Sequence, residues 1–208
     1  MTRSILVLPG GAYRRHAPHE GEPVAEWLRT LGWDARVVEY PILTRHPEPL
    51  RFLQREVLRE RETHDTVGVL GFSAGGHLAG LSALTRDAAA GERPDFAILC
   101  YPVVSMLTST HKESRENLLG KHASWWKRRS VSLEKLVTAS APPMFIWHTV
   151  EDKPVPVEHS YLLGSALGRH GVVHDLHVFA EGKHGIGFAP GVPAVVWRAL
   201  AERWLDRF

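Results

Sequence analysis

The sequence has a single cysteine, Cys100, among its 208 residues. One thiol cannot form an internal disulfide, and it leaves a metal–thiolate cluster without ligands. Cys100 lies in the apolar run Phe96–Tyr101, so we expect a buried structural thiol rather than a reactive one. The glycine-rich stretch Gly71–Gly76 also lacks the lysine and hydroxyl residue of a phosphate-binding loop. We therefore expect no disulfide, no metal and no cofactor.

An excess of charge of one sign is also absent. The chain has 25 basic and 23 acidic residues, a formal net charge of +2, which gives no electrostatic reason to expect nucleic acid or an anionic membrane as a partner. No apolar stretch approaches the roughly 20 residues of a membrane-spanning helix. A strand-like run begins within a few residues of the N-terminus and leaves no room for a cleavable signal. We expect a soluble cytoplasmic protein and leave its oligomeric state open.

Internal repeats and low-complexity tracts are missing as well, and the chain instead alternates short apolar runs with amphipathic segments. Continuous apolar runs predict buried strands, and apolar residues at helical spacing predict helices. The expected strands are Ser4–Leu8, Asp34–Tyr40, Thr66–Leu70, Phe96–Tyr101, Met144–His148 and Val172–Val178, and the expected helices are Glu22–Leu31, a stretch containing Leu50–Leu58, Ala74–Thr85, Val157–His170 and Val192–Phe208. This alternation predicts an α/β protein with a doubly wound parallel sheet of about six strands, formed by residues 1–208 as a single domain.

Residues 105–135 interrupt the alternation and are predicted to form a lid-like insertion. The segment is polar and basic but carries the adjacent Trp125 and Trp126. Loops of this length inside compact domains are usually lids or binding elements. We expect the two indole rings either to form one wall of a substrate pocket or to pack the insertion onto the body of the domain.

The stretch Leu70–His77 carries the strongest chemical signal. A buried-strand pattern stops there and a small-residue helical pattern begins, with Ser73 between Gly71 and Gly75. A chain that turns from strand to helix so abruptly places the serine on a tight corner with its hydroxyl clear of the sheet edge. The same corner makes the amide of Ala74 a free donor at the helix N-terminus, where an oxyanion is stabilised.

Loops that follow the other predicted strands carry further candidate groups. Ligands bind at the carboxyl ends of the strands in open parallel sheets, so these loops are the expected place for chemistry. They contain Pro9–Ala12 after the first strand, Asp152 after the fifth and His184 after the sixth. A serine nucleophile needs a base within hydrogen-bond reach, and the base needs an acceptor that fixes its tautomer. The pair Gly10-Gly11 presents two adjacent amides beside the serine.

Some neighbouring residues compete for these roles. Glu151 precedes Asp152 and competes with it for the role of orienting acid. His77 lies one helical turn after Ser73 and is expected to pack or to form a hydrogen bond rather than act as a base. His148, at a strand end, is expected to be structural.

Four stretches together resemble the α/β-hydrolase superfamily: Pro9–Tyr13, Gly71–His77, Asp152–Pro156 and Gly182–Gly185. More narrowly, they are similar to bacterial acetyl esterases and xylan-esterase-like proteins related to the hormone-sensitive-lipase group. The resemblance covers nearly the whole chain and implies a minimal α/β-hydrolase fold with a short cap. It implies Ser73 as nucleophile, His184 as general base, Asp152, whose proline-terminated spacing matches the family, as orienting acid, and the amides of Gly11, Ala12 and Ala74 as oxyanion hole. Beside these implied roles, Tyr13, Trp125 and Trp126 are our candidate substrate contacts.

The chain departs from that group in two ways. Pro9 stands where the group usually carries a histidine before its glycines, so any role of that histidine is absent. The chain also begins at what the family would count as its third strand, and it lacks a long cap. A short cap implies an open site that accepts small acyl groups.

The resulting expectation is a serine carboxylesterase that acts through an acyl-enzyme on small-molecule esters, with acetylated sugars as candidate substrates. One alternative is an amidase of the kynurenine-formamidase type, because those relatives also place a glycine pair after the first strand and need a small acyl pocket. The other is a non-catalytic binding module on the same scaffold.

Overall fold

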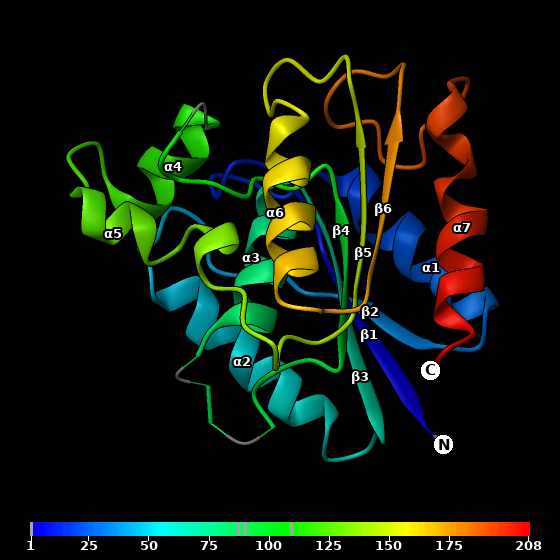
Figure 1. Cartoon of the computed structure of the whole chain (residues 1–208). Coiled ribbons are helices and arrows are strands. Elements are labelled where there is room, and N and C mark those ends of the chain that lie inside the picture. Colours follow the sequence, from blue (N-terminus) through cyan, green and yellow to red (C-terminus); the bar gives the residue numbers. More distant parts are fainter. Residues whose placement is uncertain (1, 87, 90, 109) are drawn as a thin grey trace.

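The computed structural model describes residues 2–86, 88–89, 91–108 and 110–208. Its centre is a six-stranded sheet in the order β2-β1-β3-β4-β5-β6, in which every neighbouring pair is parallel (Figure 1). The strands are β1 (Arg3–Leu8), β2 (Asp34–Val37), β3 (Thr66–Phe72), β4 (Phe96–Cys100), β5 (Met144–Thr149) and β6 (His174–Phe179). The predicted doubly wound parallel sheet is confirmed.

Helices cover both faces of the sheet. Figure 1 shows α1 (Glu22–Thr30) and α7 (Trp197–Leu205) on one side, and α2 (Glu48–Glu60), α3 (Ser73–Leu84) and α6 (Glu158–Arg169) on the other. Alternate residues of β1 enter different cores: Ile5 and Val7 pack beneath α1 and α7, whereas Leu6 and Leu8 pack beneath the other three helices. This alternation is the two-residue period of a strand that is buried on both faces.

Two predicted elements differ from the structure. The predicted strand Asp34–Tyr40 ends at Val37. Beyond it, Tyr40 is buried and its hydroxyl donates a hydrogen bond to the carbonyl of Pro9. The predicted last helix is a 3₁₀ turn, Pro193–Val196, followed by α7.

Helix α3 packs unusually close to the sheet, and all its residues are buried. A Cβ atom on Gly75 would lie 2.2 Å from the carbonyl oxygen of Leu8, and one on Gly71 would lie 2.4 Å from the carbonyl oxygen of Gly75. Only glycine allows backbones to approach so closely. The two glycines that flank Ser73 therefore fix the start of α3 against β1 and β3, as the sequence pattern predicts.

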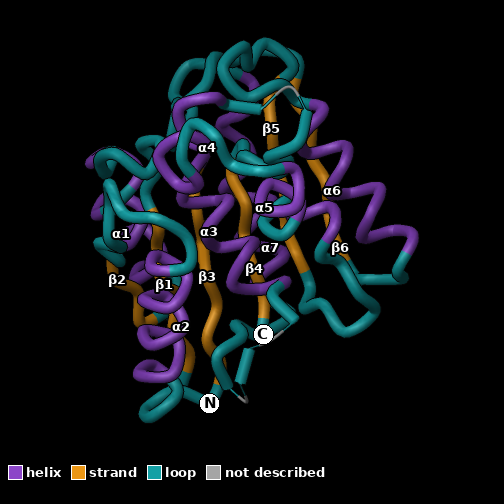
Figure 2. Tube along the Cα trace, turned by 90° about the vertical axis from the view of Figure 1, so that its left-hand side faces the viewer, coloured by secondary structure: helices purple, strands orange, loops and turns teal. Residues whose placement is uncertain are grey.

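The insertion between β4 and β5 contains α4 (Lys112–Leu119) and α5 (Trp125–Arg129) and lies outside the helices of one face (Figures 1 and 2). Leu118 and Leu119 anchor it in the core. Trp125 and Trp126 are 54% and 74% exposed, so the expectation that they pack the insertion onto the body is wrong.

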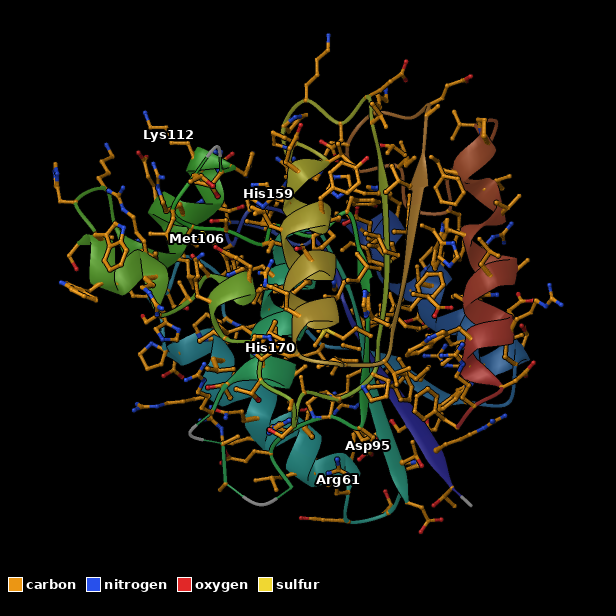
Figure 3. The ribbon with its side chains drawn as sticks, viewed as in Figure 1. Arg61, Asp95, Met106, Lys112, His159 and His170 are labelled. Atoms are coloured by element: carbon orange, nitrogen blue, oxygen red, sulfur yellow. The ribbon has the colours of Figure 1, made fainter. Side chains whose placement is uncertain are left out.

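The start of the insertion is tied to α6 by His159. This side chain comes from α6 (Figure 3), and its Nδ1 accepts hydrogen bonds from the amides of Val104 and Ser105. The contact fixes the chain where it leaves β4. Within the described part of the chain, no helix has the length and apolar character needed to cross a membrane.

Candidate active site

Ser73 occupies the sharp turn between β3 and α3. Its backbone φ is +53°, in the left-handed region that residues with a side chain rarely adopt. Such strain persists only where the surrounding structure enforces it, and here the two flanking glycines and the packing of α3 do so. A serine on a strained strand-to-helix turn is the nucleophile elbow of serine hydrolases.

The loops after β5 and β6 bring Asp152 and His184 to this serine. Ser73 Oγ lies 2.8 Å from His184 Nε2, and His184 Nδ1 lies 2.6 Å from Asp152 Oδ2. The ionised carboxylate can only accept, so Nδ1 carries the hydrogen and Nε2 offers its lone pair to the serine hydroxyl. The structure therefore joins the three predicted residues in one chain of hydrogen bonds, in the tautomer that a general base needs.

A second strained turn lies beside Ser73. Gly11, Ala12 and Tyr13 have consecutive φ values of +128°, +59° and +57°. Gly11 and Ala12 line the same cavity as Ser73. Ala74 is the second residue of α3, and the first four amides of a helix have no partner within it. The three predicted oxyanion donors thus come from the strained turn and from the elbow.

A cavity of about 390 Å³ opens above Ser73. It is lined by Gly11, Ala12, Arg14, Arg15, Ala17, His19, Glu20, Ser73, His111, Glu113, Pro154, His184 and Gly185. The apolar side chains in this lining are no larger than proline, and the rest are polar or charged. The cavity suits a short acyl group and a polar alcohol better than a long hydrocarbon chain.

Comparison with known proteins places this chain in a family. Residues 48–167 match the model of the family described as BD-FAE. The chain belongs to the BD-FAE family. Together with the six-stranded parallel sheet and the similarity to solved hydrolases, this membership identifies an α/β-hydrolase.

Relatives of this BD-FAE chain include two curated bacterial proteins. An endo-1,4-beta-xylanase B of Butyrivibrio fibrisolvens is 35% identical over 206 residues, covering 89% of this chain and 32% of the relative. An acetylxylan esterase of Xylanibacter ruminicola is 31% identical over 202 residues, covering 89% of this chain and 41% of the relative. The chain thus spans less than half the length of either.

A solved structure matches more completely. The acetyl ester-xyloside bifunctional hydrolase of Caldicellulosiruptor lactoaceticus is 37% identical, with a TM-score of 0.95, and the match covers 100% of this chain and 83% of that one.

Asp152, the predicted orienting acid of this BD-FAE chain, is held from several sides. Its Oδ1 accepts the amide of Val155 at 2.9 Å, and Oδ2 faces His148 Nε2 at 3.2 Å as well as His184. Burial alone would raise the pKa of Asp152, but hydrogen bonds from His148 and His184 outweigh it and leave the pKa below its ordinary value. The carboxylate is therefore ionised at neutral pH.

His148 contributes more than the structural role predicted for it. It is fully buried, its Nε2 also lies 2.9 Å from the carbonyl of Val155, and its Nδ1 lies 2.7 Å from Ser160 Oγ. Nε2 is therefore the protonated nitrogen and donates toward Asp152. The sequence signal for this contact is the spacing of four residues between a strand-end histidine and the aspartate.

Glu151, the alternative acid, points elsewhere. It is exposed, and its carboxylate accepts the amide of Gly182 at 3.0 Å. This bond braces the start of the loop that carries His184. The structure thus brings Asp152, and not its neighbour, to the histidine.

Tyr13 is not brought to the cavity. It is fully buried, and its hydroxyl lies 2.7 Å from His77 Nδ1, while His77 Nε2 lies 2.8 Å from the carbonyl of Val131. The carbonyl must accept, so the tyrosine donates to Nδ1. Burial, partly offset by the bond to Val131, lowers the pKa of His77 to about 4. Tyr13 and the neutral His77 therefore hold the strained turn from the side of the protein core.

The two tryptophans also lie away from the cavity. Their rings meet edge to face on the exposed surface of α5, with centroids 4.6 Å apart. The insertion reaches the cavity instead through His111 and Glu113, where α4 begins. Glu113 forms an ion pair with Arg14 at 3.1 Å. Burial, followed by repulsion from His184, lowers the pKa of His111. These contacts correct the prediction that aromatic residues line the site.

A metal-binding cluster does not emerge from the described residues. No group of three or more histidine, cysteine, aspartate and glutamate side chains among them is arranged to hold a metal ion.

Proposed function

We propose that this chain is a serine carboxylic ester hydrolase that removes acetyl and other small acyl groups from sugar-linked esters. The observation that carries the proposal is the continuous hydrogen-bond chain from Ser73 through His184 to Asp152, beside the strained turn of Gly11 and Ala12. The acetylxylan esterase of Xylanibacter ruminicola and the acetyl ester-xyloside hydrolase of Caldicellulosiruptor lactoaceticus support an acetylated sugar as substrate.

The geometry suits acyl transfer in two steps. Ser73 Oγ attacks the ester carbonyl carbon while His184 Nε2 takes the hydroxyl proton, and the carbonyl oxygen becomes an oxyanion within reach of the free amides. The tetrahedral intermediate collapses, the C–O bond to the alcohol breaks, and His184 returns the proton to the leaving oxygen. Water then attacks the acyl-enzyme in the same way and releases the acid and the serine. Asp152 holds the imidazole in place throughout.

The cavity supports the choice of substrate. Its lining offers no aliphatic wall for a long acyl chain, and Arg14, His19, His111 and Glu113 place hydrogen-bonding groups around the serine. A sugar presents many hydroxyl groups to such a surface. The first part of the insertion supplies two of these four residues, which supports a lid-like role for residues 105–135.

The acyl-length preference tests this function. Among p-nitrophenyl esters from acetate to decanoate, we expect acetate to give the highest kcat/KM, with a loss of at least about tenfold by octanoate, because each poorly accommodated methylene costs on the order of 1 kcal/mol. Acetylated xylooligosaccharides should release acetate. Preference for decanoate, or hydrolysis of N-formylkynurenine without ester hydrolysis, would contradict the proposal.

Acidification should remove activity through a single proton. Protonation of His184 Nε2 occupies the lone pair that accepts the proton of Ser73, so kcat/KM should fall by about tenfold per pH unit at the acid limit. Because the pKa of Asp152 is lowered, its ionised carboxylate goes on stabilising the fold until the pH falls through that lower value. Circular dichroism should therefore show folded protein where the rate has already dropped. A flat profile would argue against a histidine base.

A further inference from the structure

Glu20 is a buried carboxylate that the mechanism above does not use. It ends the 3₁₀ turn Pro18–Glu20, is only 2% exposed, and lines the cavity above Ser73. Its Oε2 accepts the amide of Gly10 at 2.8 Å, and its Oε1 accepts the hydroxyl of Tyr101 at 2.6 Å. A carboxylate with so little solvent persists only when both oxygens have donors.

Both hydrogen bonds of Glu20 are donated to its carboxyl oxygens. Tyr101 Oη accepts the amide of Gly187 at 2.8 Å, so its own hydrogen points to Glu20. Burial, together with the charge of Glu20, raises the pKa of Tyr101 well above its ordinary value and keeps the phenol a donor. The short bond between them is charge-assisted.

The residues that bond to Glu20 and Tyr101 lie on opposite sides of the site. Gly10 directly precedes Gly11 in the strained turn, and Gly187 follows His184 by three residues. The ring of Tyr101 also meets that of His184 edge to face, with centroids 5.2 Å apart. A single buried connection thus runs from the turn that offers oxyanion donors to the loop that carries the general base.

We propose that Glu20 is a positioning residue, which holds the oxyanion turn through Gly10 and, through Tyr101, the loop of His184. The inference rests on the proposed esterase function. Ala12 and Tyr13 have positive φ, a strained conformation that residues with a side chain keep only where the surrounding structure enforces it. Without the hydrogen bond that Gly10 donates to Glu20 the turn relaxes, and its amides leave the position that the oxyanion occupies.

This role predicts a loss in kcat rather than in substrate binding. Oxyanion contacts form only in the transition state, and removing one donor outright costs about 10²–10³-fold in kcat. A variant that displaces the oxyanion amides without deleting them should lose less in kcat. We expect Glu20→Gln to lower kcat for p-nitrophenyl acetate by about 10–100-fold, with KM changed less than about twofold.

The matched control is Glu22→Gln. Glu22 lies two residues further on, at the surface, where it pairs with Arg29. The same chemical change there should leave kcat and KM at the wild-type values. Every rate is divided by the concentration of active sites titrated with a fluorophosphonate, so that a loss of folded protein lowers the number of sites but not kcat per site.

A second readout and a second variant make the test decisive. Affinity for a trifluoromethyl ketone, which forms a tetrahedral adduct on the serine, should fall in Glu20→Gln by about the same factor as kcat. Tyr101→Phe should lower kcat about tenfold. The double variant should be about as active as the less active single variant, because both substitutions break the same connection.

Unchanged kcat per site in Glu20→Gln overturns the proposal, and if that variant does not fold, unchanged kcat in Tyr101→Phe does so. These results are distinct from failure of the proposed function, in which the wild-type protein itself hydrolyses no ester.

Discussion

Ester hydrolysis by the Ser73→Ala variant is expected to fall by about 10⁵-fold or more in kcat for p-nitrophenyl acetate. The change removes the proposed nucleophile, Ser73 Oγ, which lies 2.8 Å from His184 Nε2. The oxyanion donors and the cavity remain, so a small residual rate above that in water is expected. Labelling by a fluorophosphonate should disappear together with the activity.

The fold of this variant should be intact, because the change deletes one oxygen at a position whose strain lies in the backbone. Thermal unfolding and near-ultraviolet circular dichroism of the variant should therefore resemble those of the wild type. Ser82→Ala is the matched control: Ser82 lies on the same helix, and its Oγ is buried without a hydrogen-bond partner. It should keep the wild-type rate. Turnover of Ser73→Ala at the wild-type rate would rule out the assignment of the nucleophile.

The parts of this molecule that the sequence predicts are those encoded by local patterns. Thr66–Leu70 is a continuous apolar run, and the small residues that follow it allow α3 to press against β1, so strand, turn and helix can all be inferred from about twenty consecutive residues. The alternation of such units then determines a parallel sheet whose loops meet at one edge.

The contacts that support the site cannot be inferred from local patterns, because they join distant parts of the chain. Glu20 lies in a polar, proline-containing stretch that carries no periodic pattern, and its partner Tyr101 is 81 residues away. His111 reaches the cavity only because Leu118 and Leu119 pack the insertion into the core. Neither residue has a neighbour in sequence that signals its role.

The incorrect predictions about the site concern aromatic side chains. An aromatic residue next to a catalytic motif suggests contact with substrate, but the direction of a side chain is determined by its backbone. Tyr13 has a φ of +57° and points into the core, where His77 accepts its hydroxyl. Trp125 and Trp126 lie on a short helix whose exposed face they occupy. Neither the inward direction of Tyr13 nor the exposure of the two tryptophans can be inferred from the type of residue alone.

The Asp152→Asn variant is expected to lose about 10⁴-fold in kcat. Asparagine preserves the shape of the side chain and can still accept the amide of Val155, but its amide group would confront the N–H groups that His148 and His184 now direct at Oδ2. Two donors cannot share a hydrogen bond, so the imidazole of His184 would favour the tautomer with its hydrogen on Nε2. That tautomer cannot take the proton of Ser73. Steady-state kinetics on p-nitrophenyl acetate measures the loss.

Glu151→Gln is the matched control for this change and also separates the two carboxylates that compete in the sequence. Glutamine can still accept the amide of Gly182, and Glu151 makes no contact with the imidazole, so the rate should stay within about twofold of the wild type. Both variants remove one negative charge from the same loop, but only Asp152→Asn should change the tautomer of His184. Comparing their rates therefore distinguishes a residue that orients the imidazole from one that only holds the loop of His184 through Gly182. A large loss in Glu151→Gln with a normal rate in Asp152→Asn would transfer the role of the acid to Glu151 and would require the loop after β5 to rearrange in the active enzyme.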